Sequence, residues 1–323
     1  MRIGIIRFSS IGDIILCTPV FRWLKENISD VEVVFLTKKG FTDLLKGNPN
    51  IDRVLAWDDP KDRTDWKNYH FDFIIDLHNN LRSRRATLNH WFVPKTRLDK
   101  QNFRKTLMVL FRNTILFECK PITERIMQTV ESLGDVSSYN STLDFFNISK
   151  PDNIYFPKEY GVIVLGGSFK TKQIPAEKVV EIINKDINNW ILIGGPQDKN
   201  IAASIEKNCS NGNCIINLAG KISIHESAYC IQNSNITVTS DTGMYHIAVA
   251  LGKPVAVFWG NTVPEMGMVA PNKGLEKMVH MEVRNLSCRP CSKLGFDDCP
   301  KGHFRCMMDQ KIDSLFEEIE KIL

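Results

Sequence analysis

Residues 236–252 read ITVTSDTGMYHIAVALG, and this stretch decides the fold. Ile236–Thr239 is rich in β-branched residues and predicts a buried strand, whereas the run that ends at Gly252 predicts a helix. The turn between them carries hydroxyl, carboxylate and imidazole side chains and a glycine, contributed by Ser240, Asp241, Thr242, Gly243 and His246. A strand-to-helix turn in an α/β protein presents backbone N–H groups that favour a phosphate. We therefore expect an α/β sheet with an anion site at this turn.

Strands and helices alternate along both halves of the chain. Strands rich in Val and Ile are expected at 2–7, 31–36, 52–56 and 71–76, and again at 161–165, 190–193, 215–218 and 254–259. Little polar alternation marks these runs, which is typical of parallel strands buried on both faces. Helices such as 11–27 and 176–186 complete βα units with right-handed crossovers. The pattern predicts an α/β fold with two Rossmann-like, doubly wound domains that face each other across a cleft.

The boundary between the halves is expected where Pro151, Asn153 and Pro157 interrupt the chain. The expected parts are an N-terminal domain at 1–153, a C-terminal domain at 154–310 and an amphipathic, acidic helix at 311–323. Whether that last helix packs back on the first domain is left open by the sequence.

Two segments of the first half have weaker patterns. Residues 57–69 turn polar around Pro60, which predicts a loop. Residues 79–135 are less regular, and helices are expected there at 102–117 and 123–133.

Composition limits the class of protein. The 323 residues are 43% hydrophobic and 24% charged, and the net charge of +4 gives no reason to expect a nucleic-acid partner. The apolar start is too short for a signal peptide, and no apolar run approaches the roughly 18–20 residues of a spanning helix. We therefore expect a cytoplasmic protein that at most touches a membrane surface.

A second polar turn, Ser9-Ser10-Ile11-Gly12-Asp13, follows the first strand. Open α/β sheets place their ligands at such strand ends. Gly12 would allow a ligand close to the backbone, and Asp13 would project from the first helical turn. In the alternative, which the local sequence alone favours, a serine caps the helix and Asp13 only complements its positive end.

Two glycine-rich turns follow strands of the second half. Gly166-Gly167-Ser168, with Lys170 and Lys172 close behind, suits a diphosphate, or else is a turn with solvated lysines. The turn at 194–198 suits an adenine or a ribose, or else is a tight turn capped by Asp198. For the turn at 240–246, the alternative is a capped helix with a satisfied histidine. Because strand ends of a parallel sheet share one edge, we expect these turns to converge.

Several enzyme signatures are absent from the sequence. There is no Gly-x-x-x-x-Gly-Lys-Ser/Thr, which excludes a P-loop, and no Gly-x-Gly-x-x-Gly after either first strand, which argues against a nicotinamide dehydrogenase. Neither the Gly-x-Ser-x-Gly elbow of hydrolases nor the His-Glu-x-x-His of zinc proteases occurs.

Residues 82–112 carry nine basic side chains against one acid, Asp99. They are Arg82, Arg84, Arg85, Lys95, Arg97, Lys100, Arg104, Lys105 and Arg112, interleaved with Trp91, Phe92, Phe103 and Phe111. This mixture suits an anionic, partly apolar partner such as an anionic lipid headgroup or an acidic sugar. A solvated basic face is the alternative.

Four cysteines cluster near the C-terminus: Cys288, Cys291, Cys299 and Cys306. The first pair has the spacing of zinc ligands, the second pair is wider, and His303 could replace one ligand. A structural zinc site is one hypothesis. Packed or redox-sensitive thiols are the other.

Three motifs together resemble a known family. They are Arg2-Ile-Gly-Ile-Ile-Arg-Phe-Ser-Ser-Ile-Gly-Asp-Ile14, Lys172-Gln-Ile-Pro175 and Asp241-Thr-Gly-x-x-His246, and the cysteine-rich end is similar too. Along nearly the whole chain they resemble glycosyltransferase family 9, the heptosyltransferases. The resemblance implies the GT-B fold and transfer of heptose from ADP-heptose to the inner core of lipopolysaccharide, with no metal in the chemistry.

The resemblance also implies roles by position. It makes Asp13 the catalytic base and gives the acceptor to the first domain and the nucleotide sugar to the second. The candidates for donor binding are Lys172, Ser168, Asp241, Thr242, Gly243 and His246, with Asp198 as a ribose ligand, and those for acceptor binding are Arg82, Arg84 and Arg85. One departure is Lys172-Gln173-Ile174-Pro175, where the family often has Lys-Arg-Trp-Pro.

The resulting hypothesis is a monomeric, inverting glycosyltransferase at the cytoplasmic face of the inner membrane. It would act on an anionic lipopolysaccharide core and need no cofactor besides its ADP-sugar donor. Two alternatives stay open: a GT-B enzyme with another nucleotide sugar or glycan acceptor, and a non-catalytic homologue that only binds the nucleotide sugar.

Overall fold

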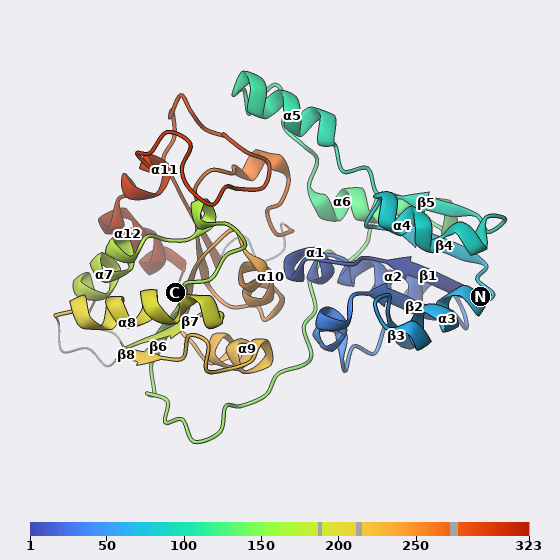
Figure 1. The fold of residues 1–323 in the computed structure, drawn as a ribbon, viewed down its shortest axis with the longest axis horizontal. Coiled ribbons are helices and arrows are strands. Elements are labelled where there is room, and N and C mark those ends of the chain that lie inside the picture. Colours follow the sequence, from blue (N-terminus) through green and yellow to red (C-terminus); the bar gives the residue numbers. More distant parts are fainter. Residues whose placement is uncertain (187–188, 211–214, 272–276, 323) are drawn as a thin grey trace. The chain divides into compact units, whose positions relative to one another are not determined.

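A computed structural model describes residues 1–186, 189–210, 215–271 and 277–322. The chain forms two compact units, which can be followed by colour in Figure 1. Unit 1 comprises Met1–Gln101, Lys120–Asn147 and a short segment from Val269, and unit 2 comprises Asn102–Cys119, Ile148–Met268 and the remaining C-terminal chain. The division thus follows Asn147, and it assigns Asn102–Cys119, which we expected in the first domain, to unit 2.

Unit 1 is built on a five-stranded parallel sheet of order β3-β2-β1-β4-β5. The strands are β1 (Arg2–Ile6), β2 (Glu32–Thr37), β3 (Arg53–Ala56), β4 (Phe73–Asp76) and β5 (Lys95–Arg97). The helices are α1 (Ile11–Ile15), α2 (Thr18–Asn27), α3 (Pro60–Asn68), α4 (Leu81–Ala86) and α6 (Ile122–Met127), with 3-10 turns at Lys39–Leu45, Leu88–His90 and Gln128–Leu133. Ile5 of β1 pairs with Phe35 on one side and Ile75 on the other, so the turns after β1 and β4 share one edge.

Helix α3 corrects the loop that we expected at 57–69. Pro60 lies at the first helical position, where its missing N–H is not needed. The Asp59 side chain accepts hydrogen bonds from two backbone N–H groups of the first turn, at 3.0 and 3.3 Å. The buried Trp66 of α3 donates its indole N–H to the Ala86 carbonyl at 2.9 Å and so fixes α3 against α4. The proline that suggested a loop therefore starts a helix.

Three other expected helices are shorter in the structure. The helix predicted at 11–27 is interrupted after Ile15 and resumes at Thr18, with Pro19 in the first turn of α2. The helix predicted at 123–133 continues as a 3-10 turn after Met127, and the one predicted at 102–117 ends at Phe111.

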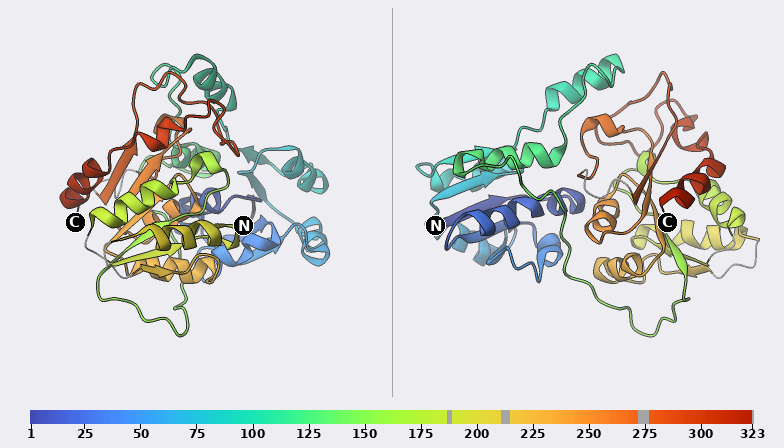
Figure 2. Two further views of the ribbon diagram at one scale, coloured as in Figure 1. Left: turned by 60° about the vertical axis from the view of Figure 1, so that its left-hand side comes forward. Right: turned by 180° about the vertical axis from the view of Figure 1, so that it is seen from behind.

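Unit 2 is built on a six-stranded parallel sheet of order β11-β10-β9-β6-β7-β8. The strands are β6 (Tyr160–Val164), β7 (Asn189–Ile193), β8 (Ile215–Asn217), β9 (Ile236–Ser240), β10 (Val255–Trp259) and β11 (Met278–Glu282). The helices are α5 (Asn102–Phe111), α7 (Ala176–Lys185), α8 (Lys199–Asn208), α9 (Ile224–Gln232), α10 (Gly243–Ala250), α11 (Arg305–Met308) and α12 (Ile312–Ile322), with 3-10 turns at Lys170–Lys172, Pro196–Asp198 and Pro264–Met266. Helix α7 packs against α8 and α12, and α9 packs against α10, as Figure 2 shows from two sides.

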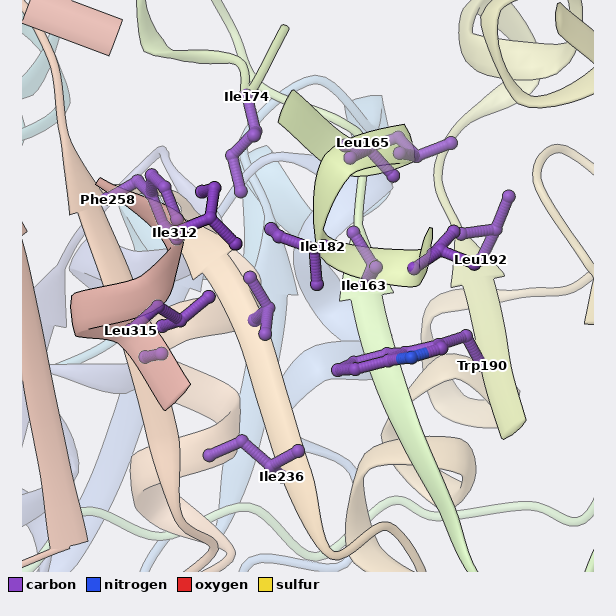
Figure 3. Packing of buried hydrophobic residues seen from close by; sticks show 14 of the residues in the cluster. Ile163, Leu165, Ile174, Ile182, Trp190, Leu192, Ile236, Phe258, Ile312 and Leu315 are labelled. Atoms are coloured by element: carbon purple, nitrogen blue, oxygen red, sulfur yellow. The ribbon is translucent and has the colours of Figure 1, made fainter. Parts of the chain in front are cut away.

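The core of unit 2 includes the final helix. Ile163, Leu192 and Trp190 pack with side chains of α7 in one buried cluster (Figure 3). Leu315 and Ile319 of α12 belong to the same cluster. The helix whose packing the sequence left open thus buries its apolar face in unit 2.

Both sheets have the strand order of a doubly wound α/β unit, and the predicted fold class is therefore confirmed. In the ranges that the structure describes, no helix has the length and apolar character needed to cross a membrane.

Candidate active site

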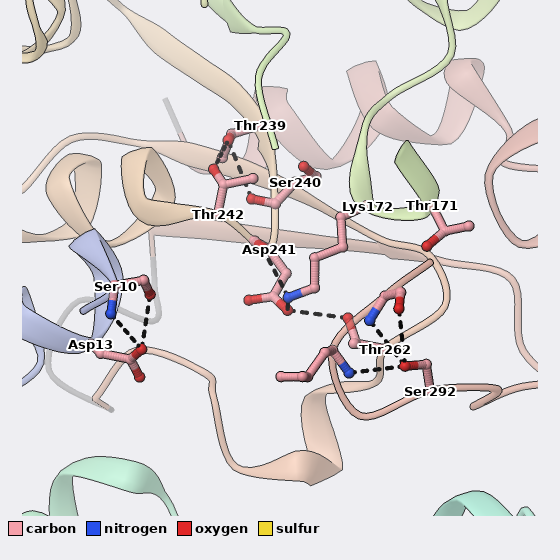
Figure 4. Close-up of polar contacts among 12 residues, drawn as sticks. Ser10, Asp13, Thr171, Lys172, Thr239, Ser240, Asp241, Thr242, Thr262 and Ser292 are labelled. Atoms are coloured by element: carbon pink, nitrogen blue, oxygen red, sulfur yellow. Dashed lines mark hydrogen bonds and ion pairs between the residues drawn. The ribbon is translucent and has the colours of Figure 1, made fainter. Parts of the chain in front are cut away.

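Lys172 and Asp241 form the centre of the candidate donor site in unit 2 (Figure 4). Lys172 follows β6 and Asp241 follows β9, so both lie at the carboxyl ends of adjacent strands. The Lys172 Nζ atom lies 2.6 Å from Asp241 Oδ2 and 3.3 Å from the Asp241 carbonyl oxygen. Thr262, which follows β10, donates its hydroxyl hydrogen to the same Oδ2 at 3.1 Å. Three neighbouring strand ends thus converge, and Thr262 is a member that no sequence motif had indicated.

The Asp241 carboxylate is only 8% exposed, so its charge depends on its partners. Burial raises the pKa of Asp241, but the charge and hydrogen bond of Lys172, together with smaller effects of His246 and Thr262, hold the pKa below its ordinary value. His246, which is buried one turn into α10, acts in the same direction. Asp241 and Lys172 are therefore an ion pair. The Lys172 side chain stays 18% exposed, which leaves a fixed cation within reach of an anion.

The start of α10 lies beside this ion pair. Thr242 occupies the N-cap position in an extended conformation, yet its side chain makes no capping hydrogen bond. The Thr242 hydroxyl instead lies 3.3 Å from Thr239 Oγ1. The first N–H groups of α10 lie at the positive end of the helix dipole, and the Thr242 side chain does not cap them. This arrangement suits a phosphate better than the capped helix of the alternative interpretation.

The turn after β6 approaches the turn after β9. A Cβ atom on Gly167 would lie 3.6 Å from Thr242 Cγ2 and 3.2 Å from Gln173 Cγ, so a side chain there would crowd both turns. Gln173 donates its amide hydrogen to the Gly167 carbonyl at 3.3 Å, and Ser168 is exposed beside it. The structure therefore brings the glycine turn, the lysine and the Asp241 loop to one sheet edge, as the sequence predicted.

Asp198 makes a hydrogen bond that holds the glycine-rich turn at 194–198. Its side chain is 3% exposed, and Oδ2 accepts a hydrogen bond from the Gly195 N–H at 2.7 Å. Burial raises the pKa of Asp198, although the Gly195 hydrogen bond opposes this shift. The contact supports the tight turn that we gave as the alternative, and a ribose-binding role for Asp198 stays a prediction.

Asp13 lies in the first turn of α1, directly after β1. Its Oδ1 atom is 2.6 Å from Nη2 of Arg7, and its Oδ2 accepts hydrogen bonds from the Ser10 N–H (3.0 Å) and hydroxyl (2.8 Å; Figure 4). Arg7 is 8% exposed and donates from Nε to the Ser9 carbonyl at 2.8 Å and from Nη1 to the Leu77 carbonyl. The carboxylate is thus oriented by Arg7 and Ser10, which both lie in the turn after β1. No role was predicted for Arg7, although a charged residue at the end of an apolar strand is a signal of one.

The surroundings of Asp13 are positively charged. Burial raises the pKa of Asp13, but Arg7 and the Ser10 hydrogen bonds hold the pKa well below its usual range. Burial and the Arg7 charge lower the pKa of Lys100, and they lower that of His78 to about 4. His78 is therefore neutral at neutral pH, and its buried Nδ1 has no hydrogen-bond partner in the described chain. An anionic group near Asp13 would meet the positive charges of Arg7 and Lys100.

The three candidate acceptor arginines lie on α4, a helix that we had not predicted. Arg82, Arg84 and Arg85 are exposed, whereas Ser83 and Ala86 of the same helix are buried against unit 1. The arginines therefore lie on the outer side of α4. They make none of the contacts to Asp13 described above.

The four C-terminal cysteines are the candidate zinc ligands. Cys288 Sγ lies 3.8 Å from His303 Nε2, but the described residues contain no group of three or more His, Cys, Asp or Glu placed to hold a metal ion. Burial raises the pKa of Cys291, and it raises that of Cys306 to about 12, so both are thiols. The zinc hypothesis and the packed-thiol interpretation both stay predictions.

Comparison with known proteins decides the family. The model of glycosyltransferase family 9 (heptosyltransferase) matches residues 63–294. The chain belongs to glycosyltransferase family 9. It is therefore a glycosyltransferase, which confirms the resemblance stated from the motifs.

Individual relatives agree with this family. Lipopolysaccharide heptosyltransferase 1 of Escherichia coli (strain K12) is 22% identical over 289 residues, which cover 82% of this chain and 89% of the relative. The crystal structure of the glycosyl transferase family 9 from Veillonella parvula DSM 2008 superposes with a TM-score of 0.77 at 16% identity, covering 99% of this chain and 96% of that one. The E. coli heptosyltransferase WaaC with ADP-2-deoxy-2-fluoro heptose superposes with a TM-score of 0.68 at 18% identity, and both chains are covered completely. These structures share the fold, whereas the roles of individual residues stay predictions.

Proposed function

We propose that this family 9 enzyme transfers heptose from ADP-heptose to a hydroxyl of the lipopolysaccharide inner core, with inversion at the anomeric carbon. The observation that carries the proposal is the Lys172–Asp241 pair beside the start of α10, which the Thr242 side chain does not cap. Together they would form a cradle for a diphosphate. The identity of the sugar and of the acceptor is inferred from similar proteins. The relatives are lipopolysaccharide heptosyltransferases, and the similar WaaC structure holds an ADP-heptose analogue.

The donor site would act on the leaving group. When the bond between the heptose and ADP breaks, negative charge gathers on the β-phosphate. The Lys172 ammonium and the N–H groups at the start of α10 would stabilise that charge, so the protein itself supplies the positive charge that the reaction needs. Asp241 holds Lys172 in place, and Thr262 holds Asp241. Ser168, Gly243 and His246 belong to the same proposed site.

Asp13 would act on the acceptor. It would take the proton of the attacking hydroxyl as that oxygen bonds to the anomeric carbon. The positive surroundings of Asp13 favour an acceptor that carries carboxylates or phosphates, and the lipopolysaccharide core is such an acceptor. We further propose that Arg82, Arg84 and Arg85 contribute to this preference. The enzyme would work as a monomer at the cytoplasmic face of the inner membrane.

Replacing Asp13 tests the chemistry. Asp13→Ala and the isosteric Asp13→Asn are expected to abolish transfer of heptose to extracted core acceptors, measured by mass spectrometry, while ADP binding measured by calorimetry stays within about threefold because the base does not hold the donor. Normal turnover by either variant would show that Asp13 is not the base.

The donor can be tested separately. A true donor should raise the midpoint of thermal unfolding by mass action, so ADP-heptose should stabilise the protein more than UDP- or GDP-sugars do. A larger shift with another nucleotide sugar would replace heptose in the proposal. Binding of ADP-heptose without turnover on any core acceptor would instead indicate a non-catalytic homologue.

A further inference from the structure

Residues 81–92 expose large apolar side chains beside three guanidinium groups. Leu81 is 84% exposed, Leu88 66%, Trp91 69% and Phe92 79%. Arg82, Arg84 and Arg85 are exposed on the same short segment, and we call this set of exposed side chains the α4 surface. Single exposed apolar residues are ordinary, but four of them within twelve residues, rimmed by charge, mark an interaction site.

The main chain beneath the α4 surface is firmly held. Ser83 of α4 donates its hydroxyl hydrogen to Asp76 Oδ2 at 2.7 Å, inside unit 1. Lys95 Nζ donates to the carbonyl oxygens of His90 (2.9 Å) and Trp91 (3.2 Å) and so closes the end of the segment. The apolar side chains are therefore exposed on a supported backbone and do not belong to a loose loop.

Trp91 and Phe92 form the most apolar part of the α4 surface. Their rings stack with centroids 3.4 Å apart and planes inclined by 29°. Each ring covers one face of the other, yet both remain mostly exposed. Tryptophan with a second ring at a protein surface is the composition that anchors proteins at the boundary between lipid headgroups and acyl chains.

The charges of the α4 surface have one sign. No acidic residue occurs between Asp76 and Asp99, whereas Arg82, Arg84 and Arg85 all lie in that interval. Arginine binds phosphate through two parallel hydrogen bonds, and basic residues beside a bilayer are attracted to anionic headgroups. Among the described residues no acid forms an ion pair with these three arginines. Exposed rings beside unpaired guanidinium groups match an anionic phospholipid surface in both respects.

We propose that the α4 surface docks on an anionic phospholipid bilayer, with Trp91 and Phe92 in the interface and the three arginines on headgroup phosphates. Only the purpose of docking rests on the proposed function: docking would keep unit 1 at the membrane, where a lipid-linked acceptor is found. Docking itself needs neither donor nor acceptor. It can therefore be tested even if the proposed reaction is wrong.

The test is sedimentation of the full chain with vesicles. Vesicles of equal parts phosphatidylglycerol and phosphatidylcholine are expected to bind the protein, and pure phosphatidylcholine vesicles to bind it at least about tenfold less. Trp91→Ser with Phe92→Ser should weaken binding to the anionic vesicles about tenfold or more, since two large rings lose their burial in lipid. Arg82→Gln with Arg84→Gln and Arg85→Gln should remove the preference for anionic vesicles, at roughly fivefold per charge.

Matched variants separate this surface from general effects. Lys46→Gln with Lys61→Gln and Lys67→Gln removes the same net charge from other exposed positions of unit 1, and it should bind like the wild type. Tyr155→Ser removes an 87% exposed ring from unit 2 and should also bind normally. Equal losses in these controls, unchanged binding of the Trp91 and Phe92 variant, or no binding of the wild type would each overturn the proposal.

Activity provides the final separation. The Trp91 and Phe92 variant should transfer sugar to a soluble core oligosaccharide without acyl chains at the wild-type rate, but more slowly to acceptor embedded in vesicles. Equal rates on embedded acceptor would show that the surface does not serve the enzyme at a membrane. Failure of the wild type on every acceptor would contradict the proposed function and leave the vesicle result standing.

Discussion

At the scale of single residues, the hold of Arg7 on Asp13 decides how the proposed base works. A carboxylate in an ion pair is fully ionised, but it is a weak base. The salt bridge at 2.6 Å therefore has two effects: it keeps Asp13 ready to accept a proton, and it lowers the driving force for that step. An acceptor hydroxyl that hydrogen-bonds to the same carboxylate would have to compete with the Ser10 donors. We infer that Arg7 is a positioning residue for the base.

Arg7→Gln should move the pH dependence of the reaction. Without the guanidinium, burial dominates and the pKa of Asp13 rises, so the acid limb of kcat/KM should shift upward by about 1–3 pH units. The pH profile of transfer measures this shift, and Arg7→Lys, which keeps the charge, should retain much of the wild-type profile. An unchanged acid limb in Arg7→Gln would show that Asp13 does not titrate under the control of Arg7.

The Arg7–Asp13 ion pair also makes the stability of the fold depend on pH. The pKa of Asp13 is lower in the folded chain than in the unfolded chain, so the stabilisation is complete above the unfolded value of about 3.9 and is lost as the pH falls toward the folded value. Denaturant unfolding of Arg7→Gln should therefore show a loss of about 1–3 kcal/mol at neutral pH, partly because the Ser9 and Leu77 carbonyls lose a donor. This loss should shrink in acid. A loss independent of pH would assign the effect to packing alone.

Lys172→Met tests the donor cradle. Removing the cation should lower kcat by about 10²–10³, because charge on the leaving phosphate loses its nearest partner. Lys170→Met is the matched control, since Lys170 is two residues away and its side chain is 68% exposed and forms an ion pair with Asp298 at 3.3 Å. Steady-state kinetics with ADP-heptose compares the two variants. Similar losses in both would assign the effect to general charge.

At the scale of elements, the sequence predicted those features that depend on local pattern. Strands such as Ile236–Ser240 are buried on both faces, so their β-branched runs identify them without tertiary information. Helix α3 was predicted as a loop because proline usually breaks a helix, although Asp59 before Pro60 is a good N-cap. Helix α4 is too short to show a clear period. Its capping box, Asn80 with Ser83, was its one local signal.

The cap of α3 gives a prediction at this scale. Asp59→Ala removes the acceptor of two backbone N–H groups and should lower the free energy of unfolding by about 1 kcal/mol, within a range of 0.5–2 kcal/mol. Asp58, one residue earlier, accepts a hydrogen bond from the Lys39 N–H. The control variant Asp58→Ala tests whether any aspartate in the turn matters as much. Denaturant titration gives both values. If Asp59→Ala lost no more stability than Asp58→Ala, the Asp59 cap would not be what starts the helix.

At the scale of the whole molecule, each unit has its own part of the proposed site and its own core. The cluster around Trp66 consists of unit 1 residues, and the cluster around Trp190 consists of unit 2 residues. The sequence predicted two such domains because βα repeats occur twice along the chain. It could not place α12 or the segment Asn102–Cys119, because an amphipathic helix shows that one face is covered but not by which part of the chain.

This division predicts where ADP alone should act. If the donor is held by unit 2, hydrogen exchange should slow at the Gly166–Ser168 turn and in the first turn of α10, whose N–H groups gain phosphate acceptors. The turn that holds Asp13 in unit 1 should exchange at its original rate, because the base contacts the acceptor and not the nucleotide. Lys172→Met should weaken the protection at α10, whereas Asp13→Asn should leave it intact. Protection confined to unit 1 would reverse the assignment of donor and acceptor, and it would do so without any measurement of turnover.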